Sequence, residues 1–179
     1  MPNGDYFLLG LLNSSAMWIV ISSICTFVRG HFYELRSIKM ETLPIPNATE
    51  VQKAQIAELA QACQSLTEQR YAIEQKVAHR MVSNLCPADK TAKLTQKAQA
   101  WWTLEFTSLQ NELKKSFGLK ASDKLIPLKD QDEWEDYVNS NRQQIAQLNQ
   151  QISEKEAAMN QAVYALFGLS EGEVGMVEG

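Results

Sequence analysis

Five residues between positions 29 and 39 have side chains that could hold a nucleic acid. They are Arg29, His31, Tyr33, Arg36 and Lys39, a run that places cations beside an aromatic ring. Guanidinium and ammonium groups bind phosphate oxygens, and an aromatic ring can stack on a base. The same residue types are also typical of a solvated strand edge, and His31 alone is typical of an ordinary surface position. The pattern predicts either a DNA contact or a charged strand edge.

A short strand is expected to position this run. Side chains between Thr26 and Ile38 alternate in a way that is typical of a strand. One face of this strand would carry Phe32, Glu34 and Arg36, and the other would carry Tyr33, Leu35 and Ser37. Arg29-Gly30, just ahead, is typical of a turn. The basic run would therefore lie on and beside one edge of a small sheet.

The sequence contains no motif that carries catalysis. It has no glycine-rich phosphate loop, no Gly-x-Ser-x-Gly elbow, no His-Glu-x-x-His and no Cys-x-x-Cys pair. Its three cysteines, Cys25, Cys63 and Cys86, are widely spaced, and only two histidines are available to complete a metal site. We therefore expect no catalytic residue, no metal site and no cofactor in this chain. Three separate cysteines favour a reducing cytoplasm as the location.

Composition favours a folded, helical protein. The 179 residues are 45% hydrophobic and 21% charged, which is ordinary for a folded chain, and glycine and proline are scarce at eight and five. The net charge is −4, so any contact with DNA must come from a local basic patch. Long tracts rich in Gln, Ala, Glu, Lys and Leu after Thr49 favour helix.

A stiff strap, Leu43-Pro44-Ile45-Pro46, divides the chain. Each proline fixes its own φ and disfavours helix at the preceding residue, so the strap interrupts any helix. Thr49 then offers a capping oxygen, and Glu50 places negative charge in the first helical turn. The strap predicts a small N-terminal subdomain over residues 1–47 and a helical part over residues 48–179.

Three helices are predicted after the strap, over residues 49–85, 89–117 and 130–167. The first would be about 55 Å long. The second is expected to end at Gly118, with Trp101 and Trp102 packed in a core. The third has a heptad stripe and is expected to end at Gly168, before a short turn capped by Ser170. The stripe consists of Val138, Ile145, Ile152, Met159 and Leu166. The predicted fold is mainly α, a long antiparallel, coiled-coil-like bundle with a small truncated α+β subdomain at its N-terminus.

The apolar segment from Phe7 to Cys25 allows several interpretations. Its length would suffice to cross a bilayer, but Asn13 and Ser14 interrupt it and no basic cluster precedes it. It could instead be a core helix, or a strand over Tyr6–Leu9 followed by a helix from about Asn13. We expect a break at Gly10 and the Asn-Ser-Ser cluster, and no membrane span.

In this order, the motifs resemble a known family. Leu9-Gly10-Leu11-Leu12-Asn13-Ser14-Ser15, Arg29-Gly30, Tyr33-Glu34-Leu35 and the proline strap resemble the end of the TaqI-like specificity domain of type IIG restriction and methylation enzymes. Leu94 to Trp102, Leu104 to Phe106, Ile126-Pro127-Leu128 with Trp134, and Val163 to Leu169 are similar to the C-terminal helical region of such proteins. The strap entering a helix also resembles the spacer junction of type I specificity subunits.

The resemblance implies that the chain is the C-terminal piece of an adenine-specific DNA methyltransferase, with or without an endonuclease domain upstream. The parent would use S-adenosylmethionine, but its Asn-Pro-Pro-Tyr motif and its cofactor loop are absent from this sequence. Most residues that read bases would precede Met1, and Asn13 fits a helix cap better than a base reader. The implied role is to help target recognition and to position the specificity domain, with DNA and the parent's catalytic domain as partners.

Two alternatives of another class stay open. The chain could be a cytoplasmic coiled-coil protein that forms homo-oligomers through an exposed apolar surface and does not bind DNA. It could also be a coiled coil anchored in a membrane by residues 7–25.

Overall fold

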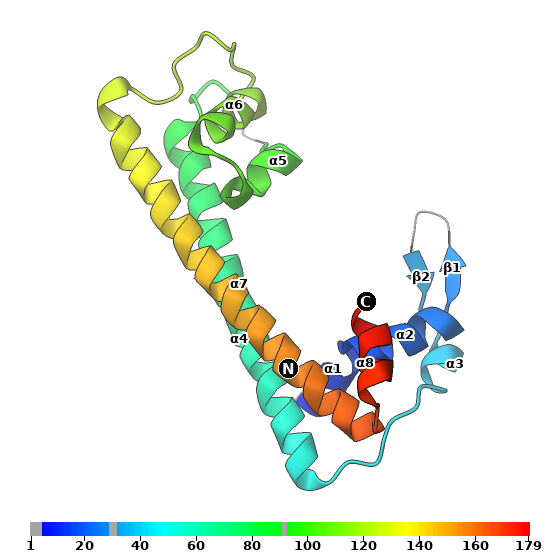
Figure 1. Cartoon of the computed structure of the whole chain (residues 1–179). Helices are drawn as coiled ribbons and strands as arrows, with labels where there is room; N and C mark the ends of the chain where they lie inside the picture. The colour runs from blue at the N-terminus through cyan, green and yellow to red at the C-terminus, as the bar shows by residue number, and fades with distance from the viewer. Residues whose placement is uncertain (1–4, 29–31, 91–92) are drawn as a thin grey trace. The chain divides into compact units, whose positions relative to one another are not determined.

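The protein is described by a computed structural model over residues 5–28, 32–90 and 93–179 (Figure 1). Helices dominate this part of the chain, which confirms the predicted mainly α fold class. The helices are α1 (Tyr6–Leu12), α2 (Ser15–Ile24), α3 (Ser37–Met40), α4 (Glu50–Leu85), α5 (Gln96–Gln99), α6 (Phe106–Ser116), α7 (Gln131–Phe167) and α8 (Glu171–Glu178). The strands β1 (Thr26–Val28) and β2 (Phe32–Glu34) form an antiparallel pair, and single 3₁₀ turns, η1 (Trp101–Thr103) and η2 (Leu128–Asp130), complete the described elements.

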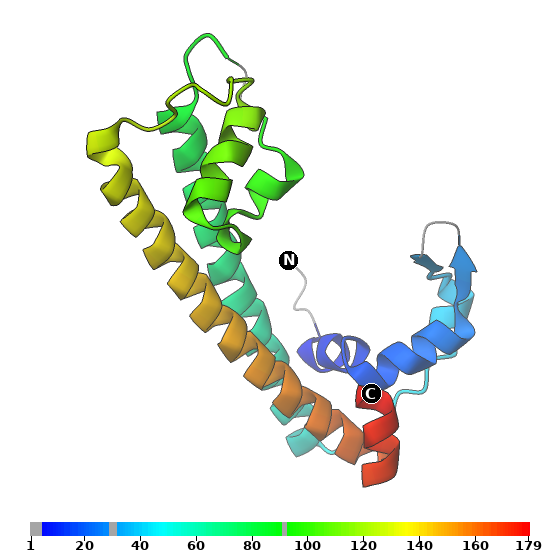
Figure 2. The ribbon, with the colours of Figure 1, turned by 45° about the horizontal axis from the view of Figure 1, so that its top comes forward.

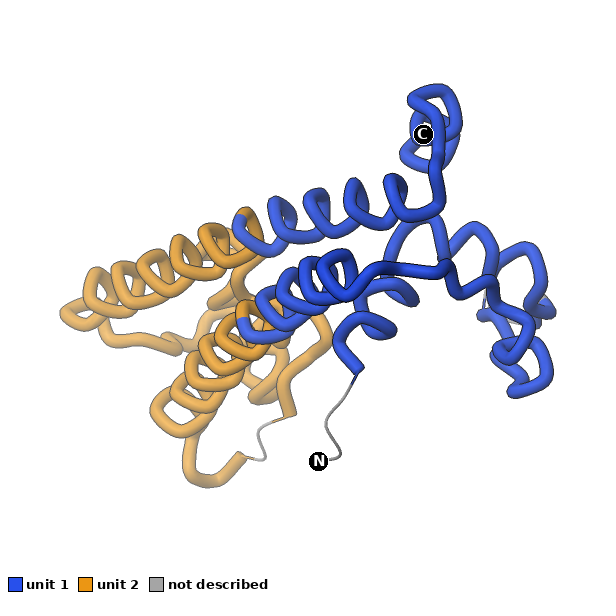
Figure 3. Tube along the Cα trace, turned by 90° about the horizontal axis from the view of Figure 1, so that it is seen from below, with its two compact units in different colours: residues 1–65, 151–179 blue, residues 66–150 orange. Residues whose placement is uncertain are grey.

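The chain divides into two compact units, coloured in Figure 3. Unit 1 consists of residues 1–65 and 151–179, and unit 2 consists of residues 66–150. Helices α4 and α7 each contribute residues to both units. We also predict that residues 1–47 are the remnant of a recognition domain. The division into units does not test where this segment comes from, so this stays a prediction.

The two long helices begin and end as the sequence predicts. Thr49 caps α4, because its Oγ1 accepts the Gln52 amide at 3.3 Å while the Gln52 side chain accepts the Thr49 amide at 2.9 Å. Helix α7 ends at Phe167, and the next residue, Gly168, has a φ of 68°, a conformation that glycine adopts without strain. Ser170 then starts α8 with a capping box to Glu173.

Helices α1 and α2 form a broken pair. Asp5 accepts the Leu8 amide at 3.0 Å and so starts α1. The alternative of a strand over Tyr6–Leu9 is therefore wrong, because this aspartate satisfies a free amide of the first turn and the backbone continues as helix to Leu12. The predicted break at Asn13 is confirmed, and Ser14 caps α2 by accepting the Met17 amide. Gly10 lies inside α1 and does not interrupt it.

Gly10 lets α1 approach two other helices closely. A Cβ atom at this position would lie 2.8 Å from Cγ2 of Ile56, 3.1 Å from Sδ of Met159 and 3.2 Å from Cβ of Ala60. Only a residue without a side chain fits at this crossing. Glycine therefore seats α1 on the first turns of α4 and the last turns of α7.

The core of unit 1 lies where these helices meet. Its buried members come from α1, α2, the strap, α4 and α7, which shows that the start of α4 runs beside the end of α7 in antiparallel fashion. They include Leu11, Met17, Ile21, Leu43, Ile56, Ala60, Met159, Val163 and Tyr164. The side chain of Asn160 adds two polar contacts to α2, accepting the Ser15 amide at 3.0 Å and donating to its hydroxyl at 3.1 Å. Helix α8 packs against α2 (Figure 2).

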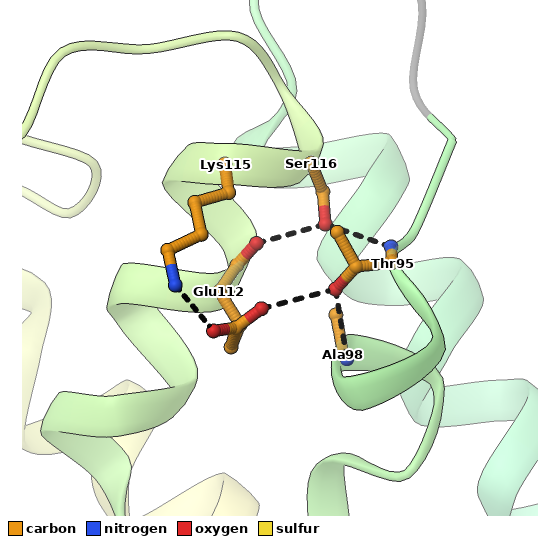
Figure 4. A network of polar contacts seen from close by, with 5 residues as sticks. All are labelled: Thr95, Ala98, Glu112, Lys115 and Ser116. Carbon is orange, nitrogen blue, oxygen red and sulfur yellow. Dashed lines mark hydrogen bonds and ion pairs between the residues drawn. The ribbon is translucent and has the colours of Figure 1, made fainter.

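In unit 2 the predicted single helix over residues 89–117 is wrong. The structure has α5, the turn η1 and α6 in its place. Thr95 caps α5 by accepting the Ala98 amide and donating to Glu112 of α6 at 3.2 Å, while its own amide donates to the Ser116 hydroxyl at 3.0 Å (Figure 4). These contacts hold α5 against α6. In one continuous helix, Thr95 and Ser116 would be far apart and could not make them.

Contacts of Arg142, on α7, explain why the chain is not helical between η1 and α6. Its guanidinium donates to the carbonyl oxygens of Trp102, at 3.2 Å, and of Leu104. Those carbonyls are thereby satisfied without continuing a helix, and Leu104 and Glu105 are extended. A partner almost forty residues away along the chain thus overrides local helix propensity.

The core of unit 2 has the antiparallel packing that the heptad pattern predicts. Val77 and Met81 of α4 pack with Val138 and Ile145 of α7, and Trp101 is fully buried as expected, with its indole donating to the Glu74 carbonyl oxygen. The other buried members are Ala98, Phe106, Leu109, Leu113, Phe117, Leu125 and Ile126. Arg70, which interrupts the apolar stripe of α4, donates to the Asn149 side chain of α7 at 2.9 Å. This polar pair favours one register between the two helices.

Candidate interaction surface

The predicted DNA-binding run is only partly brought together by the structure. Arg29 and His31 lie outside the described residues. Tyr33 lies in β2, half-buried, with its ring edge-on to Trp18 of α2 at 5.6 Å between centroids. Arg36 follows the strand, and Lys39 lies in the last turn of α3.

The described members of the run differ in what they contact. The Arg36 guanidinium pairs with Glu34 at 2.9 Å, and this hydrogen bond and the attraction to the carboxylate raise the pKa of Arg36. Both side chains are exposed, so the pair adds little stability. Lys39 is exposed. Contact of Arg29, His31, Tyr33, Arg36 and Lys39 with DNA therefore stays a prediction.

Unit 1 exposes an unusual concentration of large apolar side chains. Of the thirteen exposed large hydrophobic residues in the described part of the chain, nine lie between residues 8 and 45. We call these nine the apolar surface: Leu8, Leu9, Trp18, Ile19, Val28, Phe32, Leu35, Ile38 and Ile45. Trp18 is 54% exposed and Phe32 is 70% exposed, so these two rings alone present on the order of 250 Å². Monomeric proteins rarely expose apolar patches larger than a few hundred Å².

The local fold explains why these side chains point outward. In α2, Ala16, Met17 and Ile21 fill the core, which leaves Trp18 and Ile19 on the opposite face. In the hairpin, Val28 and Phe32 are paired across the two strands and share one face. No charged residue occurs between Tyr6 and Cys25. A solvent-facing helix normally carries charges, so the exposed faces of α1 and α2 are unusually apolar.

An open groove of about 680 Å³ adjoins the apolar surface. It is lined by the start of α1, the proline strap from Ile45 to Ala48, and the first two turns of α4. Its two carboxylates serve the fold, since Asp5 caps α1 and Glu50 pairs with Lys53 at 2.9 Å. The groove therefore has a mixed polar and apolar lining, and both of its carboxylates are engaged in the fold.

Within residues 5–28, 32–90 and 93–179, no group of three histidine, cysteine, aspartate or glutamate side chains could hold a metal ion. In the same ranges no single helix is long and apolar enough to cross a membrane. Helices α1 and α2 pass that test only as a pair, and they are bent by 67° at their junction.

Part of the apolar surface was not predicted from the sequence. The sequence predicts an apolar segment over residues 7–25, and over residues 29–39 a basic run on and beside a short strand. Phe32, Leu35 and Ile38 recur every three residues among those cations, and all three are more than half exposed. This three-residue spacing of apolar side chains is the feature of the sequence that could have indicated the apolar surface.

Comparison with known proteins identifies one family. The model of DUF8810, a domain of unknown function, matches residues 49–163, from the residue that caps α4 to a buried valine of α7. No curated protein and no solved structure matches the chain. Because the match covers more than half of the sequence, the protein belongs to the DUF8810 family.

Proposed function

We propose that this protein is the positioning module of an adenine-specific DNA methyltransferase of the restriction and modification type. In this role unit 1 docks onto the rest of the recognition domain, and the long helices hold that domain in place for the catalytic part. The chemistry, with S-adenosylmethionine, belongs to the partner. The setting would be the cytoplasm, where such enzymes meet DNA.

The apolar surface of unit 1 is the observation that supports this proposal most directly. It lies on the segment whose motifs resemble the end of a specificity domain, and such a segment needs a folded neighbour to cover it. Trp18 and Phe32 are the expected anchors, because large aromatic side chains dominate the energetics of protein interfaces.

The test uses the chain together with the methyltransferase region encoded beside it or continuous with it. Trp18→Glu with Phe32→Glu should abolish site-specific adenine methylation, because two carboxylates would be buried in the interface. Tyr71→Glu is the matched control, since Tyr71 is a 60% exposed aromatic on α4 outside the apolar surface. It should leave methylation intact.

Two results would contradict the proposal. One is a double variant that methylates as well as the wild type. The other is a genome in which no adenine methyltransferase is encoded with this chain.

The alternative of a coiled-coil protein that only self-associates also needs the apolar surface. It predicts that the isolated chain forms a dimer of fixed mass through Trp18 and Phe32 and that added methyltransferase does not dissociate it. Sedimentation with and without the catalytic region separates the two functions.

A further inference from the structure

The charges of this protein are unevenly distributed along the sequence. Residues 88–129, which connect α4 to α7, contain eight lysines and four acidic residues, a net charge of +4. Residues 130–179 contain two basic and ten acidic residues, a net charge of −8, while residues 1–87 contain seven of each. The overall charge of −4 therefore conceals a basic segment within unit 2.

Most lysines of this segment are available to a ligand. Two are engaged, because Lys114 donates to the Ala121 carbonyl oxygen at 2.9 Å and Lys115 pairs with Glu112 at 2.6 Å. The others are exposed, and within the part of the chain that the structure describes none of them makes an ion pair or a side-chain hydrogen bond. They are Lys90, Lys93, Lys97, Lys120, Lys124 and Lys129.

The fold gathers four of these lysines at one end of unit 2. Lys90 and Lys93 precede α5, and Lys120 and Lys124 follow α6. The described parts of both connections lie at the same end of the unit in Figures 1 and 2. Contacts of α5 with α6, through Thr95 and Ser116, fix this arrangement. We call these four residues the lysine cap.

The chemistry of the lysine cap suits a row of phosphates. All eight cations of residues 88–129 are lysines, which act as point charges on flexible stems, whereas planar bidentate recognition favours arginine. Such groups contact a nucleic-acid backbone without reading its bases. A membrane-binding surface would combine basic and apolar side chains. Leu128 is the single exposed large hydrophobic residue among the described residues of this segment, so a nucleic acid is favoured over a lipid surface.

Acidic residues limit where the ligand can lie. Helix α7 begins with Asp132 and Glu133, and Asp130 directly precedes it, so phosphates are repelled from that side. Lys129 lies beside these three acids and is excluded from the contact for this reason. Lys90 and Lys124 each have one acidic neighbour, Asp89 and Asp123, so the four lysines of the cap and these two acids leave a net charge of +2. We propose that the lysine cap binds the phosphate backbone of duplex DNA independently of base sequence. This contact is separate from the docking of unit 1 and does not depend on it.

The experiment measures binding of the full chain to a fluorescent duplex of arbitrary sequence, by anisotropy, at several salt concentrations from about 50 mM upward. The test variant is Lys93→Gln with Lys120→Gln and Lys124→Gln. The control removes three exposed or half-exposed lysines from α4 and α7, Lys53→Gln with Lys76→Gln and Lys155→Gln, and changes the net charge equally. Each phosphate contact adds about 0.9 to the slope of log affinity against log salt, so the test variant should lose about 2.7 from that slope.

The control should keep most of the wild-type slope and affinity, and a third variant with arginine at the three test positions should restore binding. Equal losses in the test and control variants would overturn the proposal, because only net charge would then matter. It would also be overturned if the wild type fails to bind duplex DNA at low salt, or binds vesicles containing phosphatidylserine but not DNA. None of these outcomes bears on the docking of unit 1, which is tested at Trp18 and Phe32.

Discussion

Replacing Gly10 by alanine tests the packing that orients the apolar surface. The added Cβ would lie 2.8 Å from Cγ2 of Ile56, which is a β-branched, almost fully buried side chain and cannot swing aside. Overpacking of this kind costs about 1–3 kcal/mol. It is partly offset by the gain of about 1 kcal/mol that alanine brings over glycine in a helix interior.

Gly175 provides a matched control. It lies inside α8, and a Cβ there would meet nothing within 4 Å. Gly175→Ala therefore keeps the gain in helix propensity without the clash. The two variants should differ by about 1–3 kcal/mol in the free energy of unfolding, which in a chain of this size corresponds to a melting-temperature difference of several degrees.

Urea denaturation of the two variants, followed by circular dichroism, measures this difference directly. A cycle with Ile56→Ala then locates its origin, because Gly10→Ala should cost less once the Cγ2 atom is gone. If both glycine variants change stability equally, or if the Ile56 background makes no difference, α1 does not approach α4 and α7 as closely as described here.

Three further predictions concern single polar residues. Arg142→Met should lower the free energy of unfolding by about 2–3 kcal/mol, because the carbonyl oxygens of Trp102 and Leu104 lose a charged donor. Chemical denaturation should show this loss, and the charge-preserving Arg142→Lys should recover only part of it. Asn160→Ala should cost about 1–2 kcal/mol and speed hydrogen exchange of the Ser15 amide, with no effect if the contact to α2 is absent in solution. Lys115 holds the pKa of Glu112 below its ordinary value, so the stability that this carboxylate contributes is fully present above pH 4.5 and is lost as the pH falls through the lowered pKa. Between pH 7 and pH 3 the melting temperature should therefore fall more steeply for the wild type than for Glu112→Gln. Parallel curves of melting temperature against pH would refute this prediction.

The long helices could be predicted because their signals are local. Thr49 and Gly168 mark their ends by capping chemistry, and the heptad from Val138 to Met159 marks the buried face. The antiparallel packing follows, since each stripe needs a partner and the connection returns the chain. Ser14 likewise marks the start of α2, which made the break after α1 predictable.

The middle segment could not be predicted because long-range contacts decide it. Leu94 to Phe117 has an apolar spacing that fits one helix, but Arg142 satisfies carbonyls at Trp102 and Leu104 from another helix. Thr95 is of a residue type that caps helices, but nothing local shows that Glu112 and Ser116 lie beside it. Tertiary contacts here override helix propensity.

The candidate surfaces were predictable only in part. The basic run at residues 29–39 drew attention to the right segment, but the exposed apolar side chains of that segment were not predicted. Tyr33 packs against Trp18 and Arg36 pairs with Glu34, whereas Phe32 and Ile38 are each 70% exposed. The lysine cap was not predicted: residues 88–129 have a net charge of +4, but only the fold brings the two connections that hold the cap together.

Protection of the apolar surface in the assembled enzyme is the most direct test of the positioning role. Hydroxyl-radical footprinting would compare oxidation of Trp18 and Phe32 in the isolated chain and in its complex with the methyltransferase region, with exposed Tyr71 as the internal reference. Both aromatic rings should become strongly protected in the complex, while Tyr71 should react as before. Unchanged oxidation of Trp18 and Phe32 in an active complex would contradict it.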